Sequence, residues 1–240
     1  MDTEHAYAKL TLTLRVVGVH ADGYHALDAE MVSIDLADDV MFSEGDGLTV
    51  DDLSGGPETV SAGEGNLVSR ALRAVGRRAE VRLVKRIPAG GGLGGGSSDA
   101  AAVLRWAGRA DDVALAASLG ADVPFCVRGG RARVRGAGEI VEPLPCQPGV
   151  AYTLLTPPVH VSTAAVYRAW DELGGPSSPG SNDLEPAALV VAPALARWRD
   201  VLGEAVGIAP SLAGSGSTWF VPGAYPSVPG GLVARTVCPA

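Results

Sequence analysis

Lysine is nearly absent from this chain of 240 residues. Only Lys9 and Lys85 occur, although arginine is common throughout. A compact ammonium group and a planar guanidinium are not interchangeable at a crowded site. Each lysine is therefore a candidate for a role that arginine cannot fill, with chance survival as the alternative.

Long apolar runs are also missing, which argues against a membrane span. The first ten residues, MDTEHAYAKL, contain neither a basic leader nor an apolar core, so we expect a cytoplasmic protein. A net charge of −8 argues against nucleic acid or an anionic membrane as partner. The three cysteines, Cys126, Cys146 and Cys238, follow no metal-binding spacing, and we expect buried thiols in preference to a disulfide or a zinc site.

Glycine is abundant, above all in the stretch 85–102, KRIPAGGGLGGGSSDAAA. The segment before it, EVRLV (80–84), alternates apolar and charged residues, which predicts a half-buried strand. Ser97, Ser98 and Asp99 followed by alanines predict a capped helix start. A glycine loop between a strand and a helix presents backbone N–H groups and a positive dipole end to an anion. We therefore predict a phosphate-binding loop; the alternative is a flexible linker, which is unusual in this setting.

Two common phosphate loops fit this stretch poorly. It is not a Walker A loop, because no Gly-Lys-Ser/Thr follows the glycines. Gly90, Gly92 and Gly95 match a dinucleotide-binding G-x-G-x-x-G only formally, because residues 86–89 separate the strand from the first glycine and no second buried strand leads to an acidic residue.

The remaining pattern predicts mixed helices and strands. Strands are expected over 8–17, 29–36, 39–42, 131–134, 138–144, 150–155 and 219–221. Helices are expected over 66–76, 113–119 and 164–173, with a helical region from 182 to about 202. Residues 45–62 are predicted to be a surface excursion, and Pro124 favours an extended or turn conformation after Asp122. The proline-containing segment 145–148 is the expected boundary between domains 1–147 and 148–240.

Several segments together resemble the GHMP small-molecule kinases. PAGGGLGGGSS and AGSGST are typical of that family as a whole. DGYH, GADVPF, VHVSTAAVY and NDLEP resemble the members that phosphorylate 4-diphosphocytidyl-2-C-methyl-D-erythritol. The resemblance implies an α+β protein with the GHMP kinase fold. Its N-terminal domain would be like domain 2 of ribosomal protein S5, and its abbreviated C-terminal domain would be ferredoxin-like.

The implied activity is transfer of the ATP γ-phosphate, with Mg²⁺, to the 2-hydroxyl of the methylerythritol unit in non-mevalonate isoprenoid synthesis. Asp122 matches the family's general base and Lys9 its catalytic lysine, which would stabilise charge. Asn66 lies in the adenosine segment, and Ser98 matches the loop hydroxyl that faces the phosphates and the metal. The residues matching the triphosphate loop are Pro88, Ala89, Gly90, Gly91, Gly92, Leu93, Gly94, Gly95, Gly96, Ser97 and Ser98.

The resemblance also implies a site for the cytidine end of the acceptor. Tyr24 and Tyr167 match positions whose rings sandwich the cytosine, and His25 matches the position that hydrogen-bonds its edge. Thr11 stands where the family usually has asparagine and is expected to contact the acceptor. Further acceptor contacts are expected from Thr163, Gly214, Ser215 and Gly216.

Two alternatives remain open at this point. One is a GHMP kinase that acts on a different small alcohol, and the other is a catalytically inactive nucleotide-binding homologue. Lys9, Tyr24, His25 or Asp122 taken alone could each be an ordinary structural residue. The expected partner is a small molecule, with the protein as a monomer or weak homodimer.

Overall fold

The structure, a computed structural model, describes residues 1–19, 23–56 and 58–238, whose strands form a six-stranded and a four-stranded sheet. In the first sheet the long strands β1 (Asp2–Val19) and β2 (His25–Ser43) run antiparallel. The other edge of β2 pairs first with β5 (Arg131–Gly136) and then with β4 (Glu80–Lys85). β3 (Gly47–Asp52) and β6 (Ile140–Pro143) complete the order β3-β4-β2-β5-β6, so β2 is the central strand.

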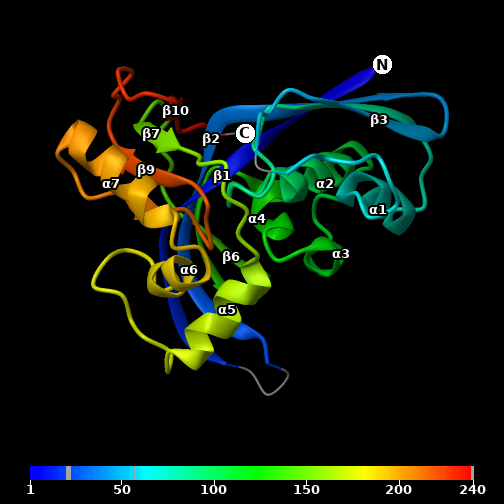
Figure 1. Cartoon of the computed structure of the whole chain (residues 1–240). Coiled ribbons are helices and arrows are strands. Elements are labelled where there is room, and N and C mark those ends of the chain that lie inside the picture. Colours follow the sequence, from blue (N-terminus) through cyan, green and yellow to red (C-terminus); the bar gives the residue numbers. More distant parts are fainter. Residues whose placement is uncertain (20–22, 57, 239–240) are drawn as a thin grey trace.

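Four helices lie together on one side of the long strands (Figure 1). They are α1 (Leu67–Ala74), α2 (Gly95–Trp106), α3 (Val113–Leu119) and α4 (Val123–Arg128). Residues 100–104 of α2 are completely buried, and three of them are alanines. Small side chains let α2 approach the sheet closely, which brings the start of this helix next to β1.

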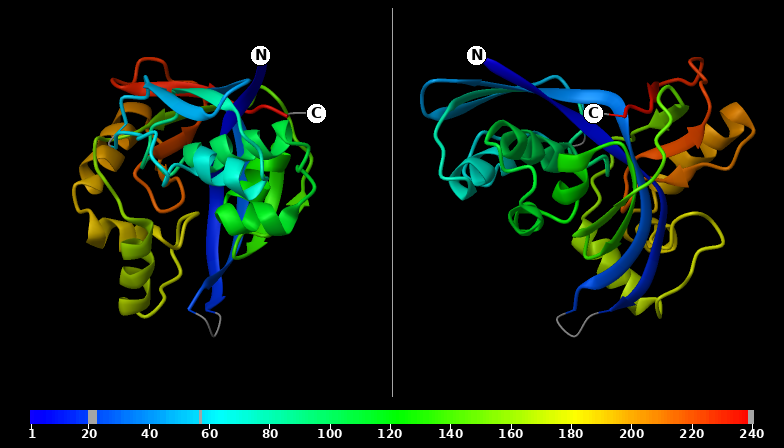
Figure 2. Two further views of the ribbon diagram at one scale, coloured as in Figure 1. Left: turned by 90° about the vertical axis from the view of Figure 1, so that its right-hand side faces the viewer. Right: turned by 180° about the vertical axis from the view of Figure 1, so that it is seen from behind.

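The second sheet lies on the other side of β1 and β2, as the views in Figure 2 show. Its order is β10-β7-β9-β8, with β7 at Ala151–Leu155, β8 at Ser211–Leu212, β9 at Trp219–Pro222 and β10 at Gly231–Arg235. Helices α5 (Thr163–Glu172), α6 (Glu185–Val191) and α7 (Leu195–Val206) belong to this half. The buried Trp219 donates its indole N–H to the Leu195 carbonyl at 3.1 Å, which fastens α7 to β9.

The predicted α+β class is confirmed, but four local predictions are wrong. Residues 29–42 form one strand, β2, and not two. The excursion at 45–62 contains β3, an edge strand whose half-exposed position explains its polar sequence. α2 begins at Gly95, with Gly94 as its N-cap, so the serines lie inside the helix. Pro124 lies in the first turn of α4, where a missing N–H costs no hydrogen bond. The boundary at 147/148 lies between β6 and β7 and stays a prediction.

The expectation of three free thiols is wrong for two of them. Cys146 and Cys238 form a disulfide, whereas Cys126 is free and buried as expected. β7 and β10 pair antiparallel, with Ala151 opposite Arg235, so the residues before β7 and after β10 lie at the same end of the sheet. This long-range pairing brings the two cysteines together, and no local spacing could reveal it.

Across residues 1–19, 23–56 and 58–238, none of the helices has the length and apolarity needed to cross a bilayer.

The disulfide should contribute measurably to stability, because it closes a loop between residues separated by 92 positions. Replacing Cys146 and Cys238 with serine should lower the free energy of unfolding by about 2–4 kcal/mol in urea denaturation under oxidising conditions. A reductant should destabilise the wild type by a similar amount and leave the double variant unchanged. Equal stabilities of oxidised wild type and double variant would contradict the disulfide.

Candidate active site

The glycine loop, defined here as residues 88–94, connects β4 to α2 and packs tightly on two neighbours. Gly92 and Gly94 have φ values of +76° and +69°. A Cβ atom on Gly92 would lie 2.4 Å from the Ala213 carbonyl oxygen, and one on Gly94 would lie 2.7 Å from Cγ of Lys9. Glycine is therefore required both by backbone conformation and by space.

Backbone hydrogen bonds hold the glycine loop from both sides. The Lys9 N–H donates to the Leu93 carbonyl at 3.0 Å, and the Thr218 N–H donates to the Gly91 carbonyl at 3.1 Å. The loop is thus fixed between β1 and the second glycine-serine turn, residues 213–218. Because the first turn of α2 follows immediately, its unpaired N–H groups lie beside the loop, as an anion site requires.

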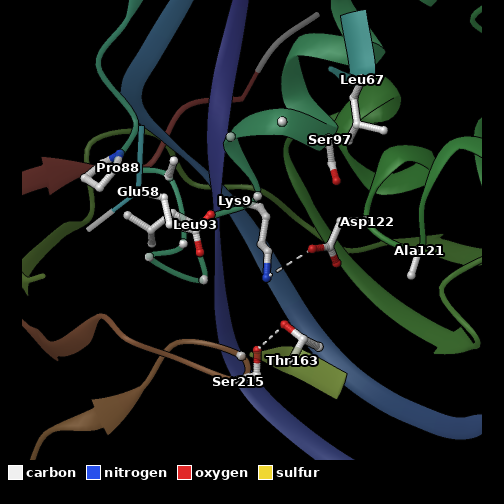
Figure 3. A pocket seen from close by; sticks show the side chains of 18 of the residues that line it. Lys9, Glu58, Leu67, Pro88, Leu93, Ser97, Ala121, Asp122, Thr163 and Ser215 are labelled. Carbon is white, nitrogen blue, oxygen red and sulfur yellow. Dashed lines mark hydrogen bonds and ion pairs between the residues drawn. The ribbon is translucent and has the colours of Figure 1, made fainter. Parts of the chain in front are cut away.

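The second turn is positioned by Asn182, a residue of the NDLEP segment. Its side-chain amide donates to the carbonyls of Leu212 at 2.9 Å and Gly214 at 2.6 Å. Next to Gly214, the Ser215 hydroxyl is hydrogen-bonded to Thr163 at 2.8 Å (Figure 3). Asn182 therefore links β1, which it bridges at Leu14, to the turn that faces the glycine loop.

Lys9 and Asp122 face one another across the cleft, as Figure 3 shows. Nζ of Lys9 lies 3.4 Å from Oδ2 of Asp122 and donates to the Thr11 hydroxyl at 3.1 Å. Lys9 is 5% exposed, whereas the Asp122 side chain is 31% exposed. Asp122 stands at the N-cap position of α4 without a capping hydrogen bond from any described residue. Its carboxylate is consequently accessible from the cleft and paired with an ammonium group.

These features surround one cleft of about 550 Å³. Most of the predicted site residues line it: Lys9, Thr11, Asn66, Pro88, Ala89, Gly90, Gly91, Gly92, Leu93, Gly94, Gly95, Gly96, Ser97, Asp122, Thr163, Tyr167, Gly214 and Ser215. Ser98, Tyr24, His25 and Gly216 are not among its lining residues. The structure thus brings the glycine loop, the Lys9–Asp122 pair and part of the predicted acceptor site together.

The predicted cytosine residues lie at the hairpin of β1 and β2 and on α5. The His25 ring lies 4.7 Å from the ring of Tyr167, and Nε2 of His25 is 2.8 Å from the Asp171 carboxylate. Burial raises the pKa of the Tyr167 hydroxyl, which keeps this ring neutral. Tyr24 is 66% exposed on the hairpin, and Asp22 of the DGYH segment lies outside the described residues. His25 and Tyr167 are therefore adjacent, while Tyr24 is away from the cleft lining.

Comparisons with known proteins bear directly on this cleft. The family model of the GHMP kinases N terminal domain matches residues 66–130. The 4-diphosphocytidyl-2-C-methyl-D-erythritol kinase of Paracoccus denitrificans is 38% identical over 241 residues, covering 90% of this chain and 85% of the relative. The kinase of the same name from Ruegeria pomeroyi is 36% identical, covering 92% and 88%. The chain belongs to the 4-diphosphocytidyl-2-C-methyl-D-erythritol kinase family.

Solved structures agree with this membership. A crystal structure of 4-(cytidine 5'-diphospho)-2C-methyl-D-erythritol kinase matches with a TM-score of 0.76 at 32% identity, covering 98% of each chain. Homoserine kinase from Cytophaga hutchinsonii matches with a TM-score of 0.62 at 20% identity, and the match covers 99% of this chain and 95% of the homoserine kinase chain. At this identity the match shows only that the two proteins share a fold. The GHMP kinase fold implied by the resemblance is confirmed. As a member of this family the protein is a small-molecule kinase, and kinases of this family take their phosphate from ATP.

The two loop serines differ in where their hydroxyl groups point. Ser98 is buried, and its hydroxyl donates to the Tyr7 carbonyl at 2.6 Å, away from the cleft. Ser97 lines the cleft, and Figure 3 shows its hydroxyl on the same side as Asp122. Ser97 is therefore the loop serine whose hydroxyl faces the cleft, and contact of either serine with phosphate or a metal ion stays a prediction. Sequence could not separate them, because both follow the glycines directly.

The cleft oxygens suit a magnesium–nucleotide complex. Mg²⁺ in kinases is usually held by one or two protein oxygens together with substrate phosphates. The Ser97 hydroxyl is a hard oxygen donor on the cleft wall, and Asp122 is left to the acceptor side. Within the described ranges no group of three or more His, Cys, Asp or Glu side chains could hold a metal ion by itself. This donor set fits an ion bound mainly through phosphate.

Asn66 has a structural role at the start of α1. Its side-chain oxygen accepts the N–H of Val68 at 2.9 Å, and its amide donates to the Ser61 carbonyl at 2.8 Å. It therefore caps α1 and holds the segment before it, which forms part of the cleft wall. A direct contact with adenosine stays a prediction.

Glu58, which lines the cleft, and Asn182, which positions the turn beside it, are two of the residues that were not predicted as part of the site. Glu58 lines the cleft beside Gly90 and pairs with His160 at 2.5 Å. It lies in a polar stretch that carries no motif, so no signal pointed to it. Asn182 was part of a recognised segment, but its hydrogen bonds to residues 30 and 32 positions away could not be derived from that segment.

The close contact of Gly92 with the second turn predicts a selective effect of alanine. Gly92→Ala should lower the free energy of unfolding by about 2–5 kcal/mol, combining left-handed strain with a clash against backbone carbonyls. Gly108→Ala is the matched control, because Gly108 has φ +71° but open space around its Cα, and it should lose only about 1–2 kcal/mol. Denaturation of both variants tests this, and equal losses would contradict the contact.

Proposed function

We propose that this protein transfers the γ-phosphate of ATP to the 2-hydroxyl of the methylerythritol unit of 4-diphosphocytidyl-2-C-methyl-D-erythritol, a step of isoprenoid precursor synthesis. The observation that carries the proposal is the Lys9–Asp122 pair, which faces the glycine loop within one cleft. Identity of 38% to a kinase of that name over most of both chains supports the choice of acceptor.

In this proposal Asp122 is the general base. As the acceptor oxygen attacks phosphorus, a new O–P bond forms, the bond from the γ-phosphorus to the β–γ bridging oxygen breaks, and ADP leaves. The hydroxyl proton passes to the Asp122 carboxylate, because a base within hydrogen-bond reach of the hydroxyl can accept its proton. The nearby ammonium of Lys9 pairs with that carboxylate and would stabilise negative charge on the attacking oxygen.

The glycine loop and the start of α2 would supply most of the rate by positioning and by electrostatic stabilisation. Their N–H groups would hold the triphosphate, while Ser97 would add a hydroxyl to the phosphates or to Mg²⁺. Bound Mg²⁺ would neutralise charge on the phosphates. The second turn, through Gly214 and Ser215, closes the cleft beside Lys9, and Thr163 with Thr11 would orient the acceptor.

The ring pair of His25 and Tyr167 supports a nucleotide acceptor. With Nε2 of His25 engaged by Asp171, Nδ1 is the ring nitrogen that would hydrogen-bond the edge of cytosine. Tyr167 offers a neutral aromatic face, and stacking on one base is worth about 1–3 kcal/mol. Tyr24 as the second stacking ring stays a prediction. A kinase for a small non-nucleotide alcohol has no need of these rings.

The activity is tested with purified protein, Mg-ATP and 4-diphosphocytidyl-2-C-methyl-D-erythritol, with ADP release as the readout. We expect ADP release that depends on this acceptor and not on homoserine or mevalonate. Turnover with another alcohol instead would assign a different acceptor. A folded protein that binds ATP but releases no ADP with any acceptor would be an inactive homologue.

Asp122→Asn should reduce kcat by about 100-fold or more, because general-base catalysis contributes at least that factor. ATP binding should change little, since Asp122 is assigned to the acceptor proton. Asp111→Asn, the same change at an exposed residue, is the control and should turn over like the wild type. An unchanged rate for Asp122→Asn removes Asp122 as the base.

A further inference from the structure

Asn182 is a buried residue that connects β1 with the second turn. It is 1% exposed and forms a parallel bridge with Leu14 of β1. On either side of it, the Leu14 N–H donates to the Ser181 carbonyl at 2.8 Å, and the Asp183 N–H donates to the Leu14 carbonyl at 2.9 Å. The backbone at Asn182 is therefore fixed to the same strand that carries Lys9.

The side-chain amide of Asn182 has no hydrogen-bond donor to spare. Its NH₂ group donates to the carbonyls of Leu212 at 2.9 Å and Gly214 at 2.6 Å, and its oxygen accepts the Leu184 N–H at 2.9 Å. Because carbonyls only accept hydrogen bonds, the amide nitrogen must be the atom that faces them. A side chain of the same shape without that NH₂ group would leave both carbonyls unpaired.

The hydrogen bond to Gly214 determines where the next backbone N–H points. The peptide between Gly214 and Ser215 is trans, and in a trans peptide the C=O and N–H point in opposite directions. The Gly214 carbonyl faces the buried Asn182, so the Ser215 N–H faces the opposite side, where both residues line the cleft. Among the residues that the structure describes, none accepts this N–H. It is consequently available to a bound molecule.

This available N–H lies close to the Lys9 ammonium. A Cβ atom on Gly214 would lie 3.4 Å from Nζ of Lys9 and 3.8 Å from the Gly92 carbonyl oxygen of the glycine loop. The Ser215 hydroxyl is held separately by Thr163, at 2.8 Å (Figure 3). The Ser215 N–H and the Lys9 ammonium are thus two donors beside the glycine loop, an arrangement that suits one anionic group.

We propose that Asn182 is a positioning residue that directs the Ser215 N–H at the phosphoryl group during its transfer. The inference rests on the proposed transfer from ATP to the acceptor hydroxyl. The acceptor oxygen bonds to the γ-phosphorus, the bond from that phosphorus to the bridging oxygen breaks, the hydroxyl proton passes to Asp122, and ADP leaves. The phosphoryl oxygens carry negative charge in this step. A preorganised N–H beside an ammonium stabilises that charge without rearrangement.

The test compares Asn182→Asp and Asn182→Ser with the wild type in single-turnover transfer, at saturating Mg-ATP and 4-diphosphocytidyl-2-C-methyl-D-erythritol. Aspartate has the shape of asparagine without its NH₂ group. Serine has one proton for two carbonyls, although its hydroxyl can still accept the Leu184 N–H. The rate of transfer should fall by about 100-fold in both variants, as expected for loss of one preorganised donor.

Affinity separates this role from a general loosening of the cleft. The dissociation constant of Mg-ATP, measured by calorimetry without acceptor, should stay within about three-fold of the wild type in both variants. The reason is that the glycine loop and the start of α2 are proposed to hold the rest of the triphosphate. Circular dichroism at the assay temperature checks that each variant is folded.

Ser181→Ala is the matched control, because it removes a side-chain hydrogen bond between the same two segments. The Ser181 hydroxyl donates to the Ser211 hydroxyl at 2.9 Å, outside the second turn. This variant loses a contact of the same kind but leaves the Gly214–Ser215 peptide in place. It should therefore transfer phosphate at the wild-type rate.

Each outcome supports or overturns the inference. A folded Asn182 variant that transfers as fast as Ser181→Ala overturns it, and so does a loss of Mg-ATP affinity as large as the loss of rate. If the buried charge prevents Asn182→Asp from folding, Asn182→Ser decides the question. A wild type that releases no ADP with any acceptor would instead overturn the proposed function, and the inference with it.

Discussion

The close backbone contact between two glycine-rich turns is the constraint on which this site depends. The glycine loop comes from the first half of the chain and the turn 213–218 from the second, and Gly92 meets the Ala213 carbonyl without room for a side chain. Hydrogen bonds from Lys9 and Thr218 hold the loop, and Asn182 holds the turn. The cleft therefore exists only when both sheets have formed and packed against each other.

Charge at the site is arranged locally, against the overall charge of the protein. The chain carries a net charge of −8, yet both of its lysines line the cleft beside the glycine loop and both are buried. Each ammonium has carboxylate partners, Lys9 with Asp122 and Lys85 with Asp38 and Asp99. Burial limits competition from water and salt, so two cations and one helix N-terminus suffice where a basic surface would otherwise be needed.

Features set by local patterns could be predicted from the sequence, and those set by distant pairings could not. The alternation in β4, the glycines and the alanines of α2 are local, and most of the residues predicted from these patterns do line one cleft. Which of Ser97 and Ser98 faces the cleft depends on where α2 begins, because a start at Gly95 turns Ser98 toward Tyr7. Asp38 with Lys85, and Cys146 with Cys238, join residues 47 and 92 positions apart. Only the strand register brings such pairs together.

Because β2 is long, the buried ion pairs of Lys85 with Asp38 and Asp99 also affect how accurately this strand is aligned during folding. A strand of 19 residues that slips by two positions keeps its apolar side chains on the same face, so burial alone discriminates weakly against that error. Such a slip would move Asp38 by about 7 Å. The Lys85 ammonium would then stay buried with one carboxylate partner fewer. Pairing of Lys85 with Asp38 and Asp99 therefore disfavours a misaligned sheet and stabilises the strand alignment from which the cleft is formed.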